Sequence, residues 1–333
     1  MTPDLGPDPA DAPPLRWGIL AAGGIARKFA ADVPAHTASS VVAVGSRSAE
    51  RAEAFAEANG VGRAHGSYEE LVADPEVEAV YVASPHSEHR DHALLAIAAG
   101  KHVLVEKSFT RNAAEAREVL DASRARGVFA MEAMWSRFLP HMAALRDVIG
   151  SGAIGDVVTL VASHGQAIAH VPRMAQPELA GGALLDLGIY PVAFAFDVLG
   201  EPSSVHATGQ LTEAGVDATL AITFGYERAV AQLSTTMLAR THNVAEIAGT
   251  AGRITAEATF FAPEAFTVHP HEGEPWRVAP EVTGGFQYQA AEVARRVHAG
   301  ELESPLRPWA EIIGTQSAMD EIRRQVGVVF PGE

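Results

Sequence analysis

The sequence predicts an α/β protein of two domains, with a doubly wound parallel sheet in the first and an open, mostly antiparallel sheet with helices (α+β) in the second. Two observations predict this division. Short apolar runs alternate with helical periods up to about residue 134, which is the rhythm of βαβ units. Beyond that point strand-like segments follow one another with turns between them, and 333 residues are enough for two cores.

Helices join the expected strands of the first half. The strands cover residues 16–21, 40–46, 79–83, 102–105 and 128–131, and the helices cover residues 24–33, 48–59, 87–99 and 113–126. Gly60 and Gly100 follow two of these helices, where a left-handed cap is common. Right-handed crossovers then place the ligand site at the carboxyl ends of the parallel strands.

The second half has the texture of a sheet with covering helices. Strands are expected over residues 156–164, 205–210, 218–224, 229–236, 243–248 and 252–256. Helices over residues 138–149, 182–199, 286–299 and 308–326 are expected to cover one face of this sheet. We therefore expect a flexible tail at residues 1–14, a first domain at residues 15–134 and a second domain at residues 135–333.

The composition excludes several classes of function. Forty-one acidic and 25 basic side chains give a formal charge of −16, which repels nucleic acid and anionic membranes. The lack of cysteine excludes disulfides and thiolate metal sites and is compatible with a reducing cytoplasm, where we expect the protein. The acidic, proline-rich start does not resemble a secretory signal, and no apolar run is expected to reach the length of about 18 residues that spans a bilayer.

The turn after the first strand carries a degenerate glycine fingerprint. Ala21 takes the first glycine position of G-x-G-x-x-G/A, Gly23 the second and Ala26 the last. Gly23 lacks a Cβ where a pyrophosphate must approach the backbone, and the next helix offers its first N–H groups to that anion. The predicted dinucleotide contacts here are Ala22, Gly23, Gly24, Ile25 and Ala26.

The end of the second strand carries arginine where NAD enzymes tend to have a carboxylate. Ser46 and Arg47 follow the strand, and Arg51 lies one helical turn later. A guanidinium pairs well with a 2′-phosphate, so these residues predict NADP rather than NAD. The alternative is that both arginines only solvate a helix start, where the helix dipole slightly disfavours a cation.

Three histidines follow the strand at residues 79–83. His86, His89 and His92 are spaced by three, which rotates successive side chains by about 60° around a helix and differs from the i, i+4 pair of zinc sites. We therefore predict no metal site. Because this loop follows the carboxyl end of a parallel strand, we expect Ser84, Pro85, His86 and His89 to border the nicotinamide.

Lysine is scarce and one lysine lies at a strand end. The chain has Lys28, Lys101 and Lys107, and Lys107 follows Glu106 where the strand at residues 102–105 ends. An ammonium there can reach a substrate hydroxyl and the nicotinamide ribose, and it can assist a neighbouring proton donor. We expect Glu106 to lie at the coenzyme site as well. The alternative is an ion pair that only closes the sheet edge.

A glycine pair precedes a segment with an acid and a phenol. We expect Gly181 and Gly182 to give the backbone room in a cleft, and Asp186 and Tyr190, four residues apart, to share one helix face. Such a pair suits proton transfer. A helical tyrosine is commonly a core residue whose hydroxyl has a partner, so this segment alone leaves both interpretations open.

Several segments together resemble the glucose–fructose oxidoreductase / inositol dehydrogenase (Gfo/Idh/MocA) family. They are GILAAGGIARKF, SPHSEH, VEKS and GGALLDLGIY, in the order and at about the spacing of the family, and the similarity covers nearly the whole chain. Within the family, MEAMWSRFLP, HVPR and Tyr190 are most similar to the dimeric dihydrodiol dehydrogenases, also described as NADP-dependent D-xylose dehydrogenases.

The resemblance implies an N-terminal Rossmann domain and NADP-dependent oxidation of a sugar or vicinal-diol hydroxyl. It also implies a C-terminal sheet that forms the interface of a homodimer or higher homo-oligomer. Lys107 matches the family's lysine, Tyr190 the catalytic tyrosine of the dihydrodiol enzymes and Asp186 the aspartate four residues before it. Ala21, His86 and Ser108 stand where the family commonly has glycine, asparagine and proline.

We therefore expect Tyr190 to exchange the substrate's hydroxyl proton while a hydride moves, with Lys107 favouring the ionised phenol and Asp186 holding hydroxyls or orienting the lysine. Candidate walls of the substrate pocket are Trp135, Arg173 and Tyr288. Two other classes stay open. One is a redox-neutral glycosidase- or lyase-type enzyme that oxidises and re-reduces its cofactor in each cycle, and the other is a non-catalytic NADP-binding regulator.

Overall fold

The computed structural model describes residues 2–333, which form two compact units. The parallel-sheet unit comprises Pro7–Trp135 and Gly284–Ile313, and the mixed-sheet unit comprises residues 2–6, Ser136–Thr283 and Gly314–Glu333. The units divide the chain differently from the boundaries expected at residues 14 and 134, because residues 284–313 return to the first unit.

Helix α8 (Phe286–His298) explains this return. It packs on α1 (Gly24–His36) rather than on the second sheet, and the carboxylate of Asp32 accepts the N–H of Phe286 at 3.2 Å. The segment expected as a tail also contacts α8 through the short helix η1 (Pro9–Asp11), and the Asp8 carbonyl accepts a bond from Arg295 at 2.5 Å. The expectation that α8 covers the second sheet is therefore wrong.

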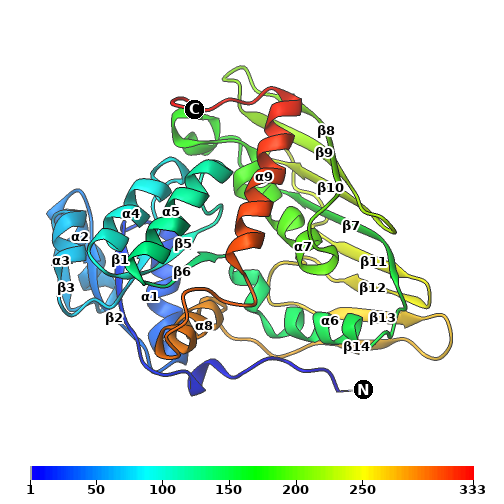
Figure 1. Cartoon of the computed structure of the whole chain (residues 1–333), viewed down its shortest axis with the longest axis horizontal. Coiled ribbons are helices and arrows are strands. Elements are labelled where there is room, and N and C mark those ends of the chain that lie inside the picture. Colours follow the sequence, from blue (N-terminus) through cyan, green and yellow to red (C-terminus); the bar gives the residue numbers. More distant parts are fainter. Residues whose placement is uncertain (1) are drawn as a thin grey trace. The chain divides into compact units, whose positions relative to one another are not determined.

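Six parallel strands form the first sheet, in the order β3-β2-β1-β4-β5-β6 (Figure 1). Their bounds are Arg16–Leu20 (β1), Ser40–Gly45 (β2), Arg63–His65 (β3), Ala79–Val82 (β4), His102–Glu106 (β5) and Ala130–Ala133 (β6). The order reverses between β1 and β4, so their carboxyl ends form the topological switch point at which such sheets bind ligands. This confirms the predicted doubly wound sheet, although three-residue β3 was too short to predict.

Helices cover both faces of this sheet. Besides α1 and α8 they are α2 (Ala49–Asn59), α3 (Tyr68–Ala73), α4 (His89–Ala98), α5 (Ala113–Arg126) and the short η2 (His86–Glu88). Helices α3, α4 and α5 share one apolar core with the strands, for example through Leu71, Ile97 and Val119. On α1, Phe29 meets the Trp17 ring edge-on at 5.1 Å and stacks on Tyr81 at 4.0 Å.

Eight strands form the second sheet, in the order β14-β13-β12-β11-β7-β10-β9-β8. Their bounds are Val157–Gly165 (β7), Ser204–Leu211 (β8), Asp217–Gly225 (β9), Val230–Thr236 (β10), Ala245–Gly249 (β11), Gly252–Ala256 (β12), Phe266–Pro270 (β13) and Trp276–Val278 (β14). Strands β7 and β10 pair in parallel and the other neighbours pair antiparallel. The predicted mostly antiparallel sheet is confirmed, with two further strands, β13 and β14.

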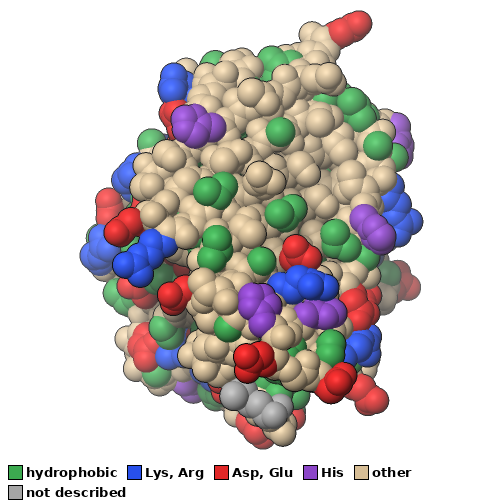
Figure 2. All heavy atoms as spheres, turned by 90° about the vertical axis from the view of Figure 1, so that its right-hand side faces the viewer, with side chains coloured by type: hydrophobic (Ala, Val, Ile, Leu, Met, Phe, Trp, Pro, Cys, Tyr) green, Lys and Arg blue, Asp and Glu red, His purple; other side chains and the backbone are tan. Residues whose placement is uncertain are grey.

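Helices cover only one face of the second sheet (Figure 1). They include α6 (Pro140–Gly150), α7 (Ile189–Leu199) and the part of α9 (Trp309–Val326) that belongs to this unit. Alternate residues such as Leu160 and Leu233 are buried under them, while Val161 and Val230 on the opposite face are 44% and 41% exposed. Figure 2 shows that opposite face, a broad part of which carries no charged side chain.

The segment predicted as one helix over residues 182–199 is divided. A π-turn covers Leu184–Gly188 and α7 begins at Ile189, so the expectation of a single α-helix is wrong. Asp186 lies in the π-turn and Tyr190 in the first turn of α7. Such π-turns are frequent at functional sites because they re-aim side chains within a helix.

One stretch is longer and more apolar than the sequence analysis expected. Pro177–Leu199 contains an 18-residue window with a mean hydropathy of 1.6, which is long and apolar enough to cross a membrane. However, 94% of that window is buried inside the structure. The stretch is thus the buried helical segment of the mixed-sheet unit.

Candidate functional site

The switch point of the parallel sheet presents a glycine turn and a helix start without a side-chain cap. Gly23 is the N-cap of α1 and makes no side-chain hydrogen bond to it, and a Cβ built on Gly24 meets no atom within 4 Å. Ala21 has a φ of 81°, in the left-handed region that favours glycine. The first N–H groups of α1 and the space before them suit an anion.

The histidines after β4 do not converge on one point. His86 Nε2 lies 3.1 Å from the carbonyl oxygen of Lys107, and His92 Nδ1 lies 2.9 Å from the hydroxyl of Ser84. Among residues 2–333, no group of three or more His, Asp or Glu side chains could hold a metal ion. The His86 ring instead connects the loops that follow β4 and β5, and the His92 ring bonds within the segment that follows β4.

His89 makes the closest connection between those two loops. Its ring is fully buried, with Nδ1 2.8 Å from the Ser108 carbonyl oxygen and Nε2 2.9 Å from the Ser84 carbonyl oxygen. A carbonyl only accepts, so both contacts are satisfied together only by the doubly protonated ring. Burial lowers the pKa of His89, and the hydrogen bonds to the two carbonyls oppose that shift.

Glu106, the last residue of β5, is a buried carboxyl group beside Lys107. Burial raises the pKa of Glu106 to about 7, and the Lys107 ammonium and a hydrogen bond from the Tyr81 hydroxyl oppose that rise. Lys107 follows at the carboxyl end of β5, as its position in the sequence predicted. Near neutral pH the carboxyl group at the end of β5 is therefore partly protonated, and the charge of Lys107 favours its ionised form.

A buried ion-pair network supports the loop that carries Lys107. The fully buried Arg307 donates to Glu132 of β6 at 2.6 and 2.9 Å and to Glu311 at 2.6 Å. The other carboxylate oxygen of Glu132 accepts the N–H of Phe109 at 2.9 Å. The sequence analysis missed Arg307 and Glu132, although the lone glutamate in the apolar run AMEAM, Glu132, was a usable signal.

The carboxyl end of β2 carries the residues predicted to select the coenzyme. Ser46 is buried, Arg47 and Arg51 are exposed, and Ser48 caps α2 by accepting the N–H of Arg51 at 3.4 Å. Burial raises the pKa of the phenol of Tyr68, the first residue of α3, and the positive charge of Arg47 opposes that rise. The sequence analysis did not single out Tyr68.

In the mixed-sheet unit, buried Asp217 holds the start of the segment that leads to Tyr190. Its carboxylate accepts the N–H of Leu184 at 2.6 Å, and burial raises the pKa of Asp217 to about 6. Gly182 has a φ of 112°, and a Cβ there would lie 2.3 Å from Asp217 Oδ1. A Cβ on Gly181 would lie 2.6 Å from the Arg173 carbonyl, so the glycine pair permits close packing rather than the predicted entry into a cleft.

Tyr190 lies in an aromatic group with His164 and Phe261. The Tyr190 ring stacks on Phe261 at 4.2 Å and meets His164 at 5.2 Å. His164 Nδ1 lies 3.0 Å from the Leu187 carbonyl and therefore donates, which leaves Nε2 to accept from the Gln166 amide at 2.9 Å. His164 and Phe261 are distant from Tyr190 along the chain, and no sequence pattern connected them.

Asp186 is paired with another predicted site residue. Arg173 donates to its two carboxylate oxygens at 3.0 and 3.1 Å, in the forked geometry that favours the charged carboxylate. Asp186 is buried, whereas the Arg173 side chain is 46% exposed. The exposed guanidinium therefore presents a positive charge beside the π-turn.

The other two predicted pocket residues belong to the parallel-sheet unit. The Trp135 indole stacks on Phe286 with the ring centroids 5.3 Å apart. Tyr288 lies on α8, and burial raises the pKa of its phenol, with the negative charge of Asp8 adding to the effect. The predicted substrate residues are thus divided between the two units.

Two family models match the chain. Residues 15–134 match the model of an oxidoreductase family with an NAD-binding Rossmann fold, and residues 142–255 match the GFO/IDH/MocA C-terminal domain. The chain belongs to the Gfo/Idh/MocA family of oxidoreductases. Its first unit is accordingly a Rossmann domain of the NAD(P)-binding type, which confirms the resemblance stated from the sequence.

Curated relatives are similar over nearly the whole chain. A trans-1,2-dihydrobenzene-1,2-diol dehydrogenase from Mus musculus is 39% identical over 331 residues, covering 95% of this chain and 98% of the relative. The enzymes of the same name from Xenopus laevis and Homo sapiens are 38% and 37% identical, each covering 95% of this chain and 99% and 98% of the relative.

Solved structures share the architecture. A 3-ketoreductase from Actinomadura kijaniata, solved with NADP and TDP-benzene, has a TM-score of 0.83 at 26% identity and covers 94% of this chain and 98% of its own. An aldose-aldose oxidoreductase from Caulobacter crescentus, complexed with glycerol, has a TM-score of 0.85 at 24% identity and covers 95% of this chain and 98% of its own, so the two proteins share a fold.

Proposed function

We propose that the protein is an NADP-dependent dehydrogenase that moves a hydride between the nicotinamide and a CH–OH carbon of a sugar or vicinal diol. The observation that carries the proposal is that the Gly23 turn, Arg47 and Lys107 each follow the carboxyl end of a strand of one parallel sheet. The names of the curated relatives support a diol substrate, and a solved neighbour at 26% identity is named a 3-ketoreductase and was solved with NADP.

The residues of the parallel-sheet unit fit an NADP molecule. The space at Gly24 and the first N–H groups of α1 suit the pyrophosphate, with Ala22, Gly23, Ile25 and Ala26 around it. Ser46, Arg47 and Arg51 would hold the 2′-phosphate, and Ser84, Pro85, His86, His89 and Glu106 would border the nicotinamide side. NADP, when bound, supplies the hydride acceptor for the reaction.

Tyr190 is the proposed acid and base. The alcohol substrate loses a hydride to the coenzyme and its hydroxyl proton to the Tyr190 phenolate, becoming a carbonyl compound, and the reverse reaction returns both. The Lys107 ammonium favours the phenolate by its charge, and the backbone N–H of Lys107 donates to the Glu106 carboxylate at 3.2 Å. Asp186, held by Arg173, orients substrate hydroxyls, and Trp135 and Tyr288 line the substrate pocket in this proposal.

A second copy of the chain is the proposed partner. The uncovered face of the second sheet exposes Val161 and Val230, and a broad part of it carries no charged side chain (Figure 2). A protein face of this kind is typically buried in an assembly. Val161→Glu is therefore expected to convert a dimer or higher homo-oligomer to monomers in sedimentation equilibrium. A sedimentation mass that Val161→Glu leaves unchanged would exclude this interface.

The absence of cysteine supports a cytoplasmic location.

A panel of pentoses, hexoses, inositols and aromatic dihydrodiols, each with NADP and with NAD, tests the function. Net absorbance of the reduced coenzyme is expected with NADP, at least about tenfold faster than with NAD, because the guanidinium groups recognise the 2′-phosphate. Product without net reduced coenzyme would instead identify a redox-neutral enzyme. Tight NADP binding without any turnover would favour the regulator.

A further inference from the structure

The two rings that pack on Tyr190 come from segments that are far apart along the chain. His164 is the second-last residue of β7, and Phe261 lies in a turn between β12 and β13. The His164 and Phe261 rings also contact each other, with their centroids 4.2 Å apart. A residue that joins these two segments therefore fixes both ring contacts of Tyr190 at once.

Asn243, two residues before β11, makes this connection. Its side-chain Oδ1 accepts the backbone N–H of Gly165, the residue after His164, at 2.8 Å. Its carbonyl oxygen accepts the backbone N–H of Phe260, the residue before Phe261, at 3.0 Å. Asn243 is buried, so removal of its side-chain acceptor leaves a buried N–H group unsatisfied.

The conformation at this position suits asparagine. Asn243 has a φ of 55°, in the left-handed region that asparagine adopts more readily than other non-glycine residues. The Thr241 hydroxyl also donates to Asn243 Oδ1, at 2.8 Å, which fixes the orientation of the amide. A Cβ on Gly165 would lie 2.6 Å from Thr241 Cγ2, so this segment packs directly against the end of β7.

The turn that Asn243 holds contacts one face of α7. Tyr190 and Phe194 are four residues apart on that helix and share the face. Phe261 stacks on Tyr190, and Phe260 packs against Phe194 with the ring centroids 5.3 Å apart. Displacement of the turn would therefore disturb the packing of the first turn of α7, where Tyr190 lies.

We propose that Asn243 is a positioning residue for Tyr190, because it holds the His164 and Phe261 rings against the phenol and so fixes the direction of its hydroxyl. This inference rests on the proposed function of Tyr190 as acid and base. Proton exchange needs the phenol oxygen within hydrogen-bond distance of the substrate oxygen, and a misplacement of about 1 Å can slow a reaction a hundredfold. Loss of the side-chain acceptor should therefore lower kcat.

Asn243→Gly isolates the side-chain hydrogen bond. Glycine keeps the left-handed conformation and the carbonyl that binds Phe260, but it lacks the acceptor for the N–H of Gly165. With the alcohol of the substrate panel that has the highest kcat, we expect kcat to fall about tenfold. The KM for that alcohol and the Kd for NADP should not change. Asn243→Asp keeps an acceptor oxygen and should recover kcat to within about threefold of the native value.

A double-mutant cycle shows whether Asn243 acts through Tyr190. In the Tyr190→Phe background, Asn243→Gly should lower kcat no further, because the hydroxyl that it positions is already absent. A merely structural role would reduce the active fraction of the protein and would lower kcat by the same factor in both backgrounds.

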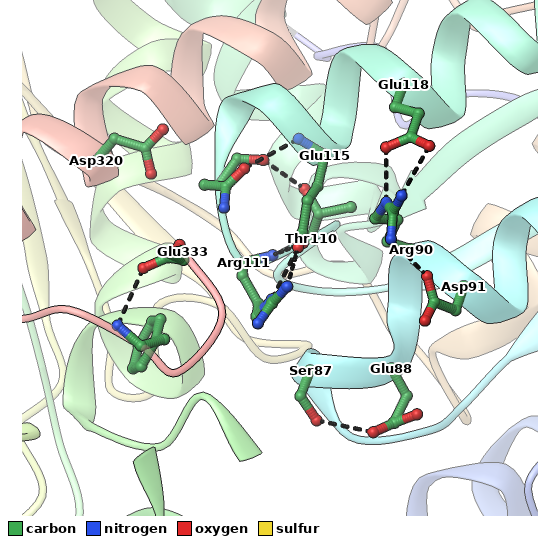
Figure 3. Close-up of polar contacts among 12 residues, drawn as sticks. Ser87, Glu88, Arg90, Asp91, Thr110, Arg111, Glu115, Glu118, Asp320 and Glu333 are labelled. Carbon is green, nitrogen blue, oxygen red and sulfur yellow. Dashed lines mark hydrogen bonds and ion pairs between the residues drawn. The ribbon is translucent and has the colours of Figure 1, made fainter. Parts of the chain in front are cut away.

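Two control variants remove comparable polar contacts elsewhere. Thr255→Val removes a side-chain hydrogen bond with His269, at 3.1 Å, in the same sheet as Asn243. Glu118→Ala removes an exposed ion pair with Arg90 in the parallel-sheet unit, which Figure 3 shows. Both variants should keep the native kcat and KM.

The outcomes separate this inference from the function on which it rests. If Tyr190→Phe is impaired, then equal losses in the two backgrounds, or a native kcat in Asn243→Gly, overturn the positioning role and leave the proposed function in place. Native turnover by Tyr190→Phe overturns both.

Thr241→Val provides the decision if Asn243→Gly does not fold. It removes the hydroxyl that donates to Asn243 Oδ1 and leaves Asn243 in place. We expect kcat to fall about threefold in the native background and not at all in Tyr190→Phe. A native kcat in Thr241→Val, or the same loss in both backgrounds, overturns the positioning role.

Discussion

The two units hold their candidate functional groups by different means. In the parallel-sheet unit Gly23, Arg47 and Lys107 each follow a strand directly, so the strand order alone brings them to one edge. In the mixed-sheet unit Tyr190 depends on His164 and Phe261, which come from distant parts of the chain. We therefore expect damage to the Gly23 turn or to Arg47 to appear in coenzyme binding, and damage to the packing around Tyr190 to appear in turnover.

The largest expected effect is on the stability of the parallel-sheet unit. Glu132→Ala removes a partner of fully buried Arg307 and leaves its charge poorly compensated, which should lower the free energy of unfolding by about 3–5 kcal/mol. The measurement is urea denaturation. Glu118→Ala breaks an exposed ion pair with Arg90 and is the matched control, with an expected loss below about 1 kcal/mol. Equal losses in the two variants would contradict the buried network.

Glu106 should make stability depend on pH in the same unit. Because burial raises its folded-state pKa from 4.5 to about 7, its stabilising contribution is complete below pH 4.5 and is lost as the pH rises through about 7. The loss is about 3 kcal/mol relative to Glu106→Gln, which keeps an acceptor for Tyr81 and does not titrate. Thermal denaturation of both proteins from pH 4 to 9 measures it, and parallel curves would show that Glu106 does not titrate as described.

Asp217 offers the corresponding test in the mixed-sheet unit. Asp217→Ala leaves the buried N–H of Leu184 without its acceptor, at a cost of about 1–3 kcal/mol, and should displace the segment that leads to Tyr190. We expect kcat to fall while the Kd for NADP stays constant. Asp217→Asn retains an acceptor oxygen and should recover most of kcat. A changed Kd for NADP would break the separation between the units.

The smallest effect is expected at the turn before α1. Ala21 has a φ of 81°, a conformation that costs a non-glycine residue about 1–2 kcal/mol. Glycine removes this strain, but its greater freedom in the unfolded chain lowers stability by about 0.4–1 kcal/mol. Ala21→Gly should therefore raise the free energy of unfolding by about 0.5 kcal/mol and leave kcat unchanged. Chemical denaturation with replicate curves can resolve such a shift, and destabilisation would argue against strain at this turn.

The sequence predicted the parts of the fold that depend on local pattern. Periodicity identified the parallel strands, and their order brings the Gly23 turn and Lys107 to one edge without further information. It could not identify short β3, nor the return of α8 to α1, because the contact between Phe286 and Asp32 joins residues far apart in the chain.

The candidate site shows the same limit more sharply. The sequence analysis singled out Gly181 and Gly182. Glycine is needed there because Asp217 and the Arg173 carbonyl approach these positions closely, which only three-dimensional packing reveals. The π-turn that carries Asp186 has no simple periodic signal, so the spacing of four residues to Tyr190 was misread as one α-helix.

The central claim is that Tyr190 exchanges the substrate proton during hydride transfer to NADP. Its most direct test is Tyr190→Phe, with kcat for the best alcohol substrate and the Kd for NADP measured on the same preparation. The account predicts a fall in kcat of about a hundredfold or more, as for loss of a general base, with an unchanged Kd. Turnover at the native rate by Tyr190→Phe would contradict it.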